Sequence, residues 1–317
     1  MTYLFGPVPS RRLGRSLGVD LIPRKCCPYD CLYCEVGPTT QQTLERGEYH
    51  TQAIIQELQD YLRGPAAELD FITLAGSGEP TLNLGLGKII AAVKEMTDIP
   101  VAVLTNGALL HLAEVRRDLA AAEVILPSLD SALEKTWRAI NRPLPEMSLA
   151  QIISGLEALR REYRGRIWLE VMLLKGLNNN EEELGALRRV IERLAPDQVQ
   201  LNTAVRPVVD DVAQPLSLEE MEAIAAFLGA GAEVIASSPR PASAETAVSD
   251  ARFLEMLARR PMTAPDLAQI LGLPLNLVQK RLKRLCESGL ISHSLYQEQG
   301  FYRSQTGTVS NSQSQTS

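Results

Sequence analysis

Apolar runs and amphipathic segments alternate along the first three quarters of the chain. Short apolar runs occur at 16–22, 69–75, 100–105, 123–128, 166–174 and 198–202. Segments with apolar residues at helical spacing follow them, at 51–62, 84–96, 108–121, 147–163, 180–194 and 217–228. Apolar strands separated by amphipathic helices are typical of a parallel sheet covered by helices. Six such pairs, two fewer than a closed barrel needs, predict an α/β fold, an open (β/α)6 partial TIM barrel.

The ends of the chain have a different composition. Residues 1–25 form a basic arm rich in Gly and Pro, in which only 16–22 has the pattern of a strand. Residues 236–249 are rich in Ser, Ala and Pro and predict a linker after a first domain at 1–235. Three short helical patterns and a hairpin candidate at 250–303 predict a small winged helix-turn-helix domain. Residues 304–317 have almost nothing apolar to bury and are expected to be disordered.

Composition narrows the function classes. The chain has 317 residues, 45% of them hydrophobic, and no apolar run near the ~20 residues that span a bilayer. No signal-peptide pattern opens it, and five cysteines without a disulfide framework suit a reducing cytoplasm. Residues 249–317 carry eight Lys/Arg and five Asp/Glu, a net charge of +3, which leaves −9 on the remainder. The larger part is therefore not a general polyanion binder, whereas the smaller part is a weak candidate.

Nine residues, Cys26 to Cys34, read C-C-P-Y-D-C-L-Y-C. Cys27, Cys31 and Cys34 are spaced C-x3-C-x2-C, so one short loop places three thiols around one centre. A closed zinc site needs four protein ligands, whereas three thiolates on a [4Fe-4S] cluster leave one iron free for another ligand. Buried inert thiols or an incidental zinc loop remain alternatives. Cys26 is interpreted as a neighbour, because adjacent residues in an extended loop point apart.

Polar motifs follow the predicted strands. They lie at the carboxyl ends of the strands, where active sites of such barrels are found. They are Gly76-Ser77-Gly78-Glu79, Thr105-Asn106-Gly107 and Ser128-Leu129-Asp130. Glu170 is the polar residue on one face of the fifth strand, which it shares with Trp168 and Met172. Each motif alone is also a common turn or helix N-cap. Their joint order behind the cysteine loop is the more specific signal.

Together these residues resemble the radical S-adenosylmethionine (SAM) superfamily. The loop matches its C-x3-C-x-aromatic-C pattern with Tyr33 before the last cysteine, and Ser77 departs from the family's G-G-E-P segment. The resemblance implies a [4Fe-4S] cluster on Cys27, Cys31 and Cys34. It also implies that SAM is held by residues of the loop and of these motifs, namely Tyr33, Gly76, Ser77, Gly78, Glu79, Thr105, Asn106, Ser128 and Asp130. Glu170 is added to this set as the polar residue of the fifth strand that could point into the cavity. The arm F-G-P-V-P-S-R-R-L-G resembles a branch of iron–sulfur oxidoreductases related to tRNA wybutosine synthesis.

The implied activity is reductive cleavage of SAM to a 5′-deoxyadenosyl radical, with electrons from a donor such as flavodoxin or ferredoxin. The radical then abstracts hydrogen from a substrate that the sequence does not name, and the relation to tRNA rests on family analogy. An iron–sulfur redox-sensing, DNA-binding regulator is the alternative, and SAM binding separates the two hypotheses. A zinc-bound structural module is a third.

Two basic regions keep open interpretations. Arg11, Arg12 and Arg15 are either a solvated arm or donors to a carboxylate or phosphate on a substrate. In the winged-helix segment a set of polar residues occupies the place of DNA groove contacts, namely Asn276, Gln279, Lys280, Lys283 and Arg284. Protein binding, or docking on the barrel, is equally open for this segment. Neither membrane contact nor an oligomeric state is indicated.

Overall fold

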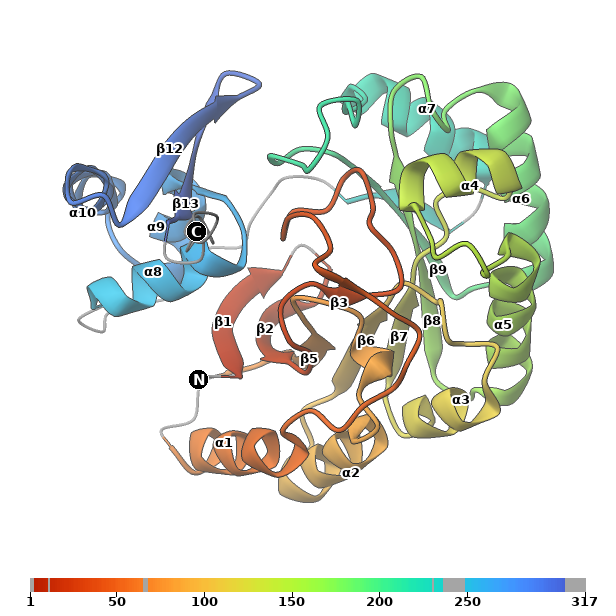
Figure 1. The fold of residues 1–317 in the computed structure, drawn as a ribbon, viewed down its shortest axis with the longest axis horizontal. Coiled ribbons are helices and arrows are strands. Elements are labelled where there is room, and N and C mark those ends of the chain that lie inside the picture. The colour runs from red at the N-terminus through yellow and green to blue at the C-terminus, as the bar shows by residue number, and fades with distance from the viewer. Residues whose placement is uncertain (1–2, 11, 65–67, 230, 236–248, 306–317) are drawn as a thin grey trace, which may run out of the picture. The chain divides into compact units, whose positions relative to one another are not determined.

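The computed structural model describes residues 3–10, 12–64, 68–229, 231–235 and 249–305. The chain divides into two compact units, Met1–Pro239 and Arg240–Ser317 (Figure 1). The predicted linker at 236–249 and tail at 304–317 lie almost entirely outside the described residues. The domain boundaries drawn from the sequence therefore stay a prediction.

The first unit is built on one eight-stranded sheet with the order β1-β2-β5-β6-β7-β8-β9-β10. The strands are β1 (Leu4–Ser10), β2 (Gly14–Asp20), β5 (Phe71–Ala75), β6 (Val101–Thr105), β7 (Val124–Pro127), β8 (Arg166–Leu173), β9 (Gln198–Thr203) and β10 (Ala232–Val234). From β2 to β10 all neighbours are parallel, and β1 pairs antiparallel with β2. The six predicted strands are β2 and β5 to β9, which confirms the open (β/α)6 partial barrel.

Helices surround the outer side of this curved sheet (Figure 1), and the described residues of the first unit form seven α-helices in all. They are α1 (Thr51–Arg63), α2 (Leu86–Met96), α3 (Ala113–Leu119), α4 (Glu134–Asn141), α5 (Leu149–Glu162), α6 (Glu181–Leu194) and α7 (Leu218–Leu228). The sequence pattern did not predict α4, which inserts between β7 and α5. The pattern also predicted a helix at 108–121, which is longer than the observed α3.

The prediction for the arm was wrong in one respect, because β1 is a strand. Gly6, Pro7 and Pro9 weakened its strand pattern. Proline is tolerated at the edge of a sheet, where a missing N–H breaks no ladder bond on the open side. Strand β10, at the other edge, was also not predicted.

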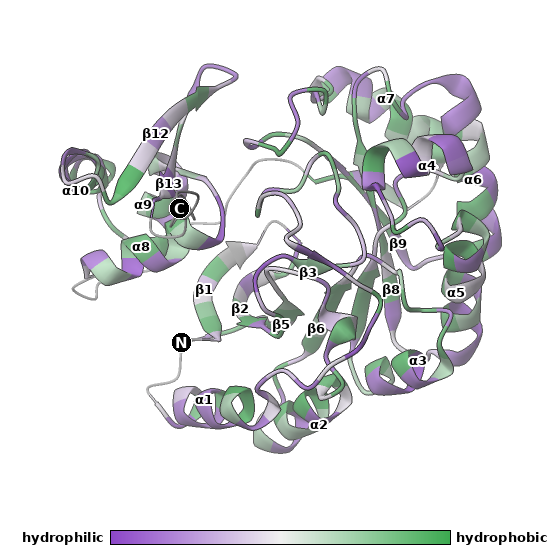
Figure 2. Cartoon of the chain, in the orientation of Figure 1, coloured by the Kyte–Doolittle hydropathy of each residue, from purple (hydrophilic) through white to green (hydrophobic). Residues whose placement is uncertain are grey.

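Alternate residues of the central strands β6, β7 and β8 pack into two separate apolar clusters. Val103 and Leu169 belong to the large cluster that the strands form with the helices. Ala102, Leu126 and Trp168 belong to an inner cluster, on the opposite face. In Figure 2 the central strands are largely green, and the helices around them carry both green and purple residues. This alternation is what leaves one face of the strand ends available for polar side chains.

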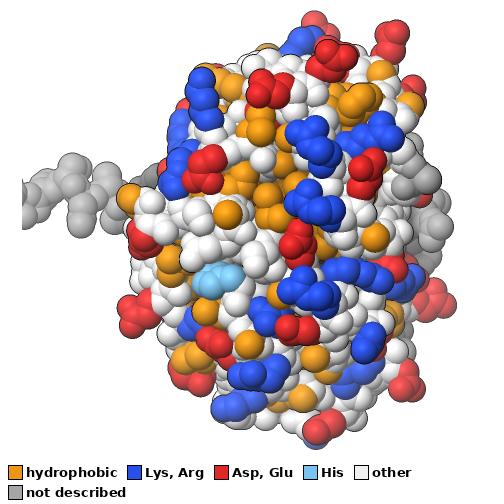
Figure 3. Space-filling view, turned by 90° about the vertical axis from the view of Figure 1, so that its right-hand side faces the viewer, with side chains coloured by type: hydrophobic (Ala, Val, Ile, Leu, Met, Phe, Trp, Pro, Cys, Tyr) orange, Lys and Arg blue, Asp and Glu red, His pale blue; other side chains and the backbone are white. Residues whose placement is uncertain are grey.

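The helical outer surface carries charges of both signs, interspersed over the face drawn in Figure 3. On α6, Arg188 pairs with Glu192 at 3.0 Å, and Arg193 reaches Glu157 of α5 at 3.2 Å. Basic residues of these helices are thus partly neutralised by acidic neighbours.

In the second unit, residues 249–305 form three helices and a three-stranded sheet with their own apolar core. Its elements are α8 (Asp250–Arg259), β11 (Met262–Thr263), α9 (Ala264–Leu271), α10 (Leu275–Glu287), β12 (Ile291–Tyr296) and β13 (Gln299–Ser304). This matches the predicted winged helix-turn-helix, including the hairpin.

Candidate cluster and cofactor site

The cysteine loop, residues 26–34, follows β2 and is fixed by the backbone of the next strand's turn. Ser77 O accepts a hydrogen bond from Lys25 N at 2.7 Å, and Cys26 O accepts one from Glu79 N at 3.0 Å. A Cβ at Gly78 would lie 2.0 Å from Cys26 O. The glycine predicted for close approach to a ligand is therefore required by the loop's own backbone.

Each of the three predicted ligand thiols has a side-chain N–H donor beside it. Asn106 Nδ2 lies 3.3 Å from Cys27 Sγ, and Lys25 Nζ lies 3.0 Å from Cys34 Sγ. At Cys31 the donor is Asn141 Nδ2, 3.5 Å from Sγ. N–H groups directed at sulfur stabilise thiolate ligands and tune iron–sulfur sites.

The other two cysteines have different surroundings. Cys26 is 1% exposed in the large core, with the Tyr49 hydroxyl 3.9 Å from its sulfur. Cys286 lies on α10 of the second unit. This agrees with the interpretation of Cys26 as a neighbour of the ligand loop.

Burial and mutual repulsion oppose ionisation of the ligand thiols in the protein alone. Burial raises the pKa of Cys27 to about 12, and Glu79 and Cys34 add to the rise. Burial also raises the pKa of Cys31 well above its usual value, as does Cys27. A polynuclear cation offsets such a cost, because it binds thiolates and supplies the missing positive charge.

A [4Fe-4S] cluster fits the residues present, on the chemistry of the donor set. N–H groups of Lys25, Asn106 and Asn141 are directed at the three thiols. Among the described residues, the buried Oδ1 atom of Asn141 has no hydrogen-bond partner. Within the described part of the chain, no group of three or more His, Cys, Asp or Glu side chains is arranged to hold a metal ion.

Glu79 is buried and accepts four hydrogen bonds. Its Oε1 accepts from Thr81 N at 3.1 Å, from Thr81 Oγ1 at 2.6 Å and from Thr105 Oγ1 at 2.6 Å. Its Oε2 accepts from Asn106 N at 2.7 Å. Burial raises the pKa of Glu79, and these donors counteract the rise. The carboxylate thus ties the turn after β5 to the turn after β6 and orients Asn106 toward Cys27.

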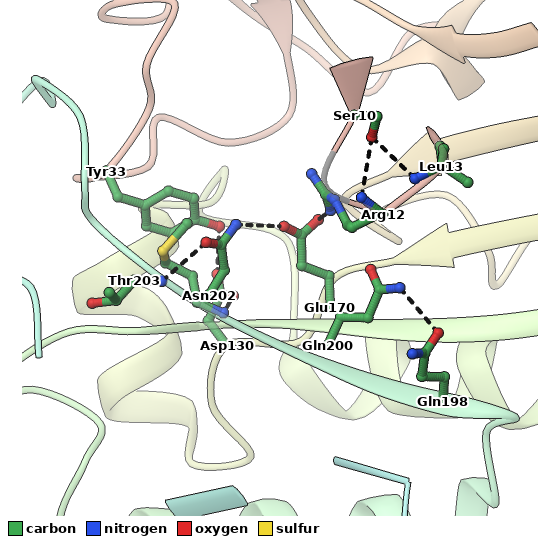
Figure 4. Close-up of polar contacts among 11 residues, drawn as sticks. Ser10, Arg12, Leu13, Tyr33, Asp130, Glu170, Gln198, Gln200, Asn202 and Thr203 are labelled. Carbon is green, nitrogen blue, oxygen red and sulfur yellow. Dashed lines mark hydrogen bonds and ion pairs between the residues drawn. The ribbon is translucent and has the colours of Figure 1, made fainter. Parts of the chain in front are cut away.

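Asp130 holds the centre of the next turn. Its Oδ2 accepts from Tyr33 OH at 2.5 Å and from Asn141 Nδ2 at 2.6 Å, and its Oδ1 accepts from Met172 N at 2.9 Å. Figure 4 shows Tyr33 directed toward Asp130. Burial raises the pKa of Asp130 to about 6, despite the three donors. Tyr33 and Asp130, 97 residues apart, are therefore part of one site.

Helix α4 supplies residues that the sequence analysis missed. Ile140 O accepts from Leu32 N at 2.9 Å, and Asn141 O accepts from Asp30 N at 3.1 Å. The end of α4 is thus joined to the cysteine loop. Trp137 and Asn141, four residues apart, are both buried. An asparagine on the apolar face of a short amphipathic helix was the signal available in the sequence.

A small pocket opens beside the loop, too small to take SAM whole. Its lining comes from the cysteine loop, the ends of two strands, β6 and β7, and α4, namely Tyr29, Tyr33, Asn106, Ser128, Leu129, Asp130, Trp137 and Asn141. Four of the predicted SAM residues, Tyr33, Asn106, Ser128 and Asp130, are therefore brought together.

The remaining predicted residues of the turns after β5 and β6 lie near the pocket, but their contacts are with neighbouring turns of the protein. A Cβ at Gly76 would lie 2.5 Å from Asp20 Oδ1. Ser77 donates to Asp20 through both its backbone N, at 3.0 Å, and its Oγ, at 2.6 Å. Thr105 O accepts a hydrogen bond from Ser128 N at 3.0 Å. These bonds fix the rim of the barrel, the edge formed by the carboxyl ends of its parallel strands.

Glu170 points into the barrel, where it meets an arginine of the arm. Arg12 Nη1 lies 2.6 Å from Glu170 Oε2, and Asn202 Nδ2 donates to Glu170 Oε1 at 3.3 Å (Figure 4). Leu13, next in sequence, is buried in the inner cluster and anchors this turn. The guanidinium group of Arg15 lies 3.8 Å from the exposed Glu68, and Arg11 lies outside the described residues. Arg12 is thus a member of the barrel interior rather than a solvated residue.

Comparison with known proteins decides the family. Residues 21–187, more than half of the chain, match the model of the radical SAM superfamily. The chain belongs to the radical SAM superfamily. Members of this superfamily are enzymes that bind a [4Fe-4S] cluster and SAM, so the predicted enzyme class and cofactors are confirmed at that level. Residues 255–292 match a winged helix-turn-helix DNA-binding model.

Several curated proteins are similar over much of this radical SAM chain. A "GTPase Obg" of Brachyspira hyodysenteriae is 37% identical over 92% of this chain, which spans only 44% of that protein. A UPF0026 protein of Methanocaldococcus jannaschii is 37% identical over 72% of this chain and 71% of its own length. A probable dual-specificity RNA methyltransferase RlmN of Flavobacterium psychrophilum is 26% identical over 62% of this chain and 58% of its own. Among the described helices, none combines the length and apolar character needed to cross a membrane.

Proposed function

We propose that this chain binds a [4Fe-4S] cluster through Cys27, Cys31 and Cys34 and uses SAM to abstract hydrogen from an RNA substrate. The observation that carries the proposal is the set of three thiols, each beside its own N–H donor, at the rim of the barrel. Such a cluster, when SAM is bound to its free iron, supplies the electron that cleaves SAM to methionine and a 5′-deoxyadenosyl radical.

The rim residues have distinct tasks in this proposal. Gly76, Ser77 and Gly78 hold the loop and offer backbone groups to methionine. A carboxylate has about four acceptor positions, and those of Glu79 are filled, so it acts by positioning Thr105 and Asn106.

The pocket takes the adenosyl end of SAM in this proposal. Ser128, Tyr33 and Asp130 line it, and Asp130 keeps one acceptor position for a ribose hydroxyl. Glu170, oriented by Arg12 and Asn202, lies on the interior side and contacts SAM or substrate.

RNA as the substrate class is supported by two observations. A relative is a probable RNA methyltransferase, and the arm resembles enzymes of tRNA wybutosine synthesis. The larger part of the chain carries −9 and repels polyanions, so the second unit, where Lys280 and Lys283 are exposed on α10, supplies the RNA contact. A reducing cytoplasm, with flavodoxin or ferredoxin as electron donor, suits the free cysteines.

The regulator hypothesis is not favoured, because the superfamily match spans the loop and the turns after β5 to β7. A pure sensor has no use for those turns.

Anaerobic reconstitution with iron, sulfide, SAM and reductant tests the proposal, with 5′-deoxyadenosine as the readout. We expect its formation to rise when a cellular RNA fraction is added and not when a small-metabolite fraction is added. Stimulation by small metabolites alone would overturn the RNA substrate class. No 5′-deoxyadenosine from protein with full iron would overturn the enzyme itself.

A further inference from the structure

Lys25 is a buried lysine whose side chain is directed at one of the three thiols. The residue is 5% exposed, and its Nζ lies 3.0 Å from Cys34 Sγ. Burying an ammonium group is unfavourable unless it is paired. The pairing with Cys34 meets this requirement once Cys34 is a thiolate.

The backbone at Lys25 is held in an uncommon conformation. Its φ is 61°, in the left-handed region that residues with a Cβ rarely adopt. Hydrogen bonds hold it there, from Lys25 N to Ser77 O at 2.7 Å and from Gln41 N to Lys25 O at 3.0 Å. These hydrogen bonds offset the cost of the left-handed backbone, and this backbone conformation directs the Lys25 side chain toward Cys34.

The three sulfurs are not equivalent. Cys27 and Cys31 have neutral amide donors, Asn106 at 3.3 Å and Asn141 at 3.5 Å. Among the described donors, only the one at Cys34 is a cationic group. Its distance to sulfur, 3.0 Å, is also the shortest of the three. The charge of Lys25 also lowers the pKa of Cys27, whereas the charge of Glu79 raises it.

We propose that Lys25 is a positioning residue that raises the reduction potential of the cluster through its charge at Cys34. The inference rests on the proposed function. Reduction transfers one electron from an external low-potential donor and adds one negative charge, with no bond made or broken. Three thiolates and the buried Glu79 and Asp130 disfavour that added charge, whereas a buried ammonium group in contact with one sulfur favours it.

A mediated redox titration of the reconstituted full-length protein tests the inference. Dithionite serves as reductant, and the electron paramagnetic resonance signal of the reduced cluster is the readout. Lys25→Met, which removes the charge at similar length, is expected to lower the equilibrium constant for reduction at least tenfold, or 59 mV for one electron. Lys25→Arg is expected to remain within threefold of the wild type. Lys88→Met, at an exposed site on α2, controls for the loss of a lysine elsewhere.

Iron content is measured on every variant before the titration. Lys25→Met or Lys25→Gln with full iron and an unchanged potential would overturn the inference. Loss of iron from both, with iron kept in Lys25→Arg, would overturn it in favour of a role in cluster assembly. A wild type that holds no cluster would instead overturn the proposed function, so the two failures are distinguishable.

Discussion

Asp130 shows at the scale of one residue how the site is held together. Its buried carboxylate joins Tyr33 of the cysteine loop, Asn141 of α4 and the backbone of β8. Asparagine has nearly the same shape but places an NH2 group where one oxygen accepted. At least one of the three donors then loses its acceptor in a buried site.

Asp130→Asn is therefore expected to lower the free energy of unfolding of the cluster-free protein by ~1–3 kcal/mol. Urea denaturation followed by circular dichroism measures this. The exposed Asp60→Asn on α1 is the control and is expected to have little effect. Equal stability of the two variants would show that the Asp130 bonds do not hold the site.

Spacing along the chain made some of these residues predictable and others not. Cys27, Cys31 and Cys34 stand within eight positions of one another, so their pattern is visible in the sequence. Asn141 lies 110 positions from Cys31, and nothing local marks the contact. Lys25 adjoins the loop, but its direction depends on a left-handed backbone that the sequence pattern does not reveal.

At the scale of elements, two helix glycines are expected to respond in opposite ways to the same substitution. Gly185 on α6 has only Arg189 Nη1 near its absent Cβ, at 3.7 Å, whereas Gly155 on α5 faces His111 N at 2.6 Å. Gly185→Ala should raise the free energy of unfolding by ~0.5–1 kcal/mol, because alanine loses less entropy in a helix. Gly155→Ala should lower it by ~1–3 kcal/mol through overpacking against the turn after β6.

Urea denaturation of both glycine variants checks these signs. A stabilising Gly155→Ala would mean that α5 does not pack closely on residues 110–111.

Elements with strong periodicity were predictable, and the edges of the sheet were not. Strands β5 to β7 consist almost entirely of apolar residues, and β8 and β9 have buried apolar residues at alternate positions, so all five stand out in the sequence. Strand β1 contains two prolines, and β10 has only three residues, so neither has a strand pattern. Helix α4, with eight residues, is too short for its periodicity to be distinguished from a loop.

At the scale of the whole molecule, the division into two compact units predicts that the barrel folds by itself. A chain truncated after Ser249 is expected to remain soluble and to bind iron and SAM like the full-length protein. Sedimentation, iron analysis and SAM titration measure this. Insoluble protein, or soluble protein without iron, would show that the barrel needs the second unit in order to fold.

The same truncation separates the roles of the two units. If the second unit supplies the RNA contact, the truncated protein should still form 5′-deoxyadenosine but lose the stimulation by RNA. Full stimulation without that unit would assign RNA binding to the barrel, against its net charge of −9.

The central claim is that three thiols of one loop hold a [4Fe-4S] cluster, and iron and sulfide analysis of the five single Cys→Ala variants tests it most directly. We expect Cys27→Ala, Cys31→Ala and Cys34→Ala to lose the cluster, because each removes one of only three protein ligands. Cys26→Ala and Cys286→Ala should keep it at the wild-type level. Near-full iron in Cys31→Ala, or none in Cys286→Ala, would contradict the account.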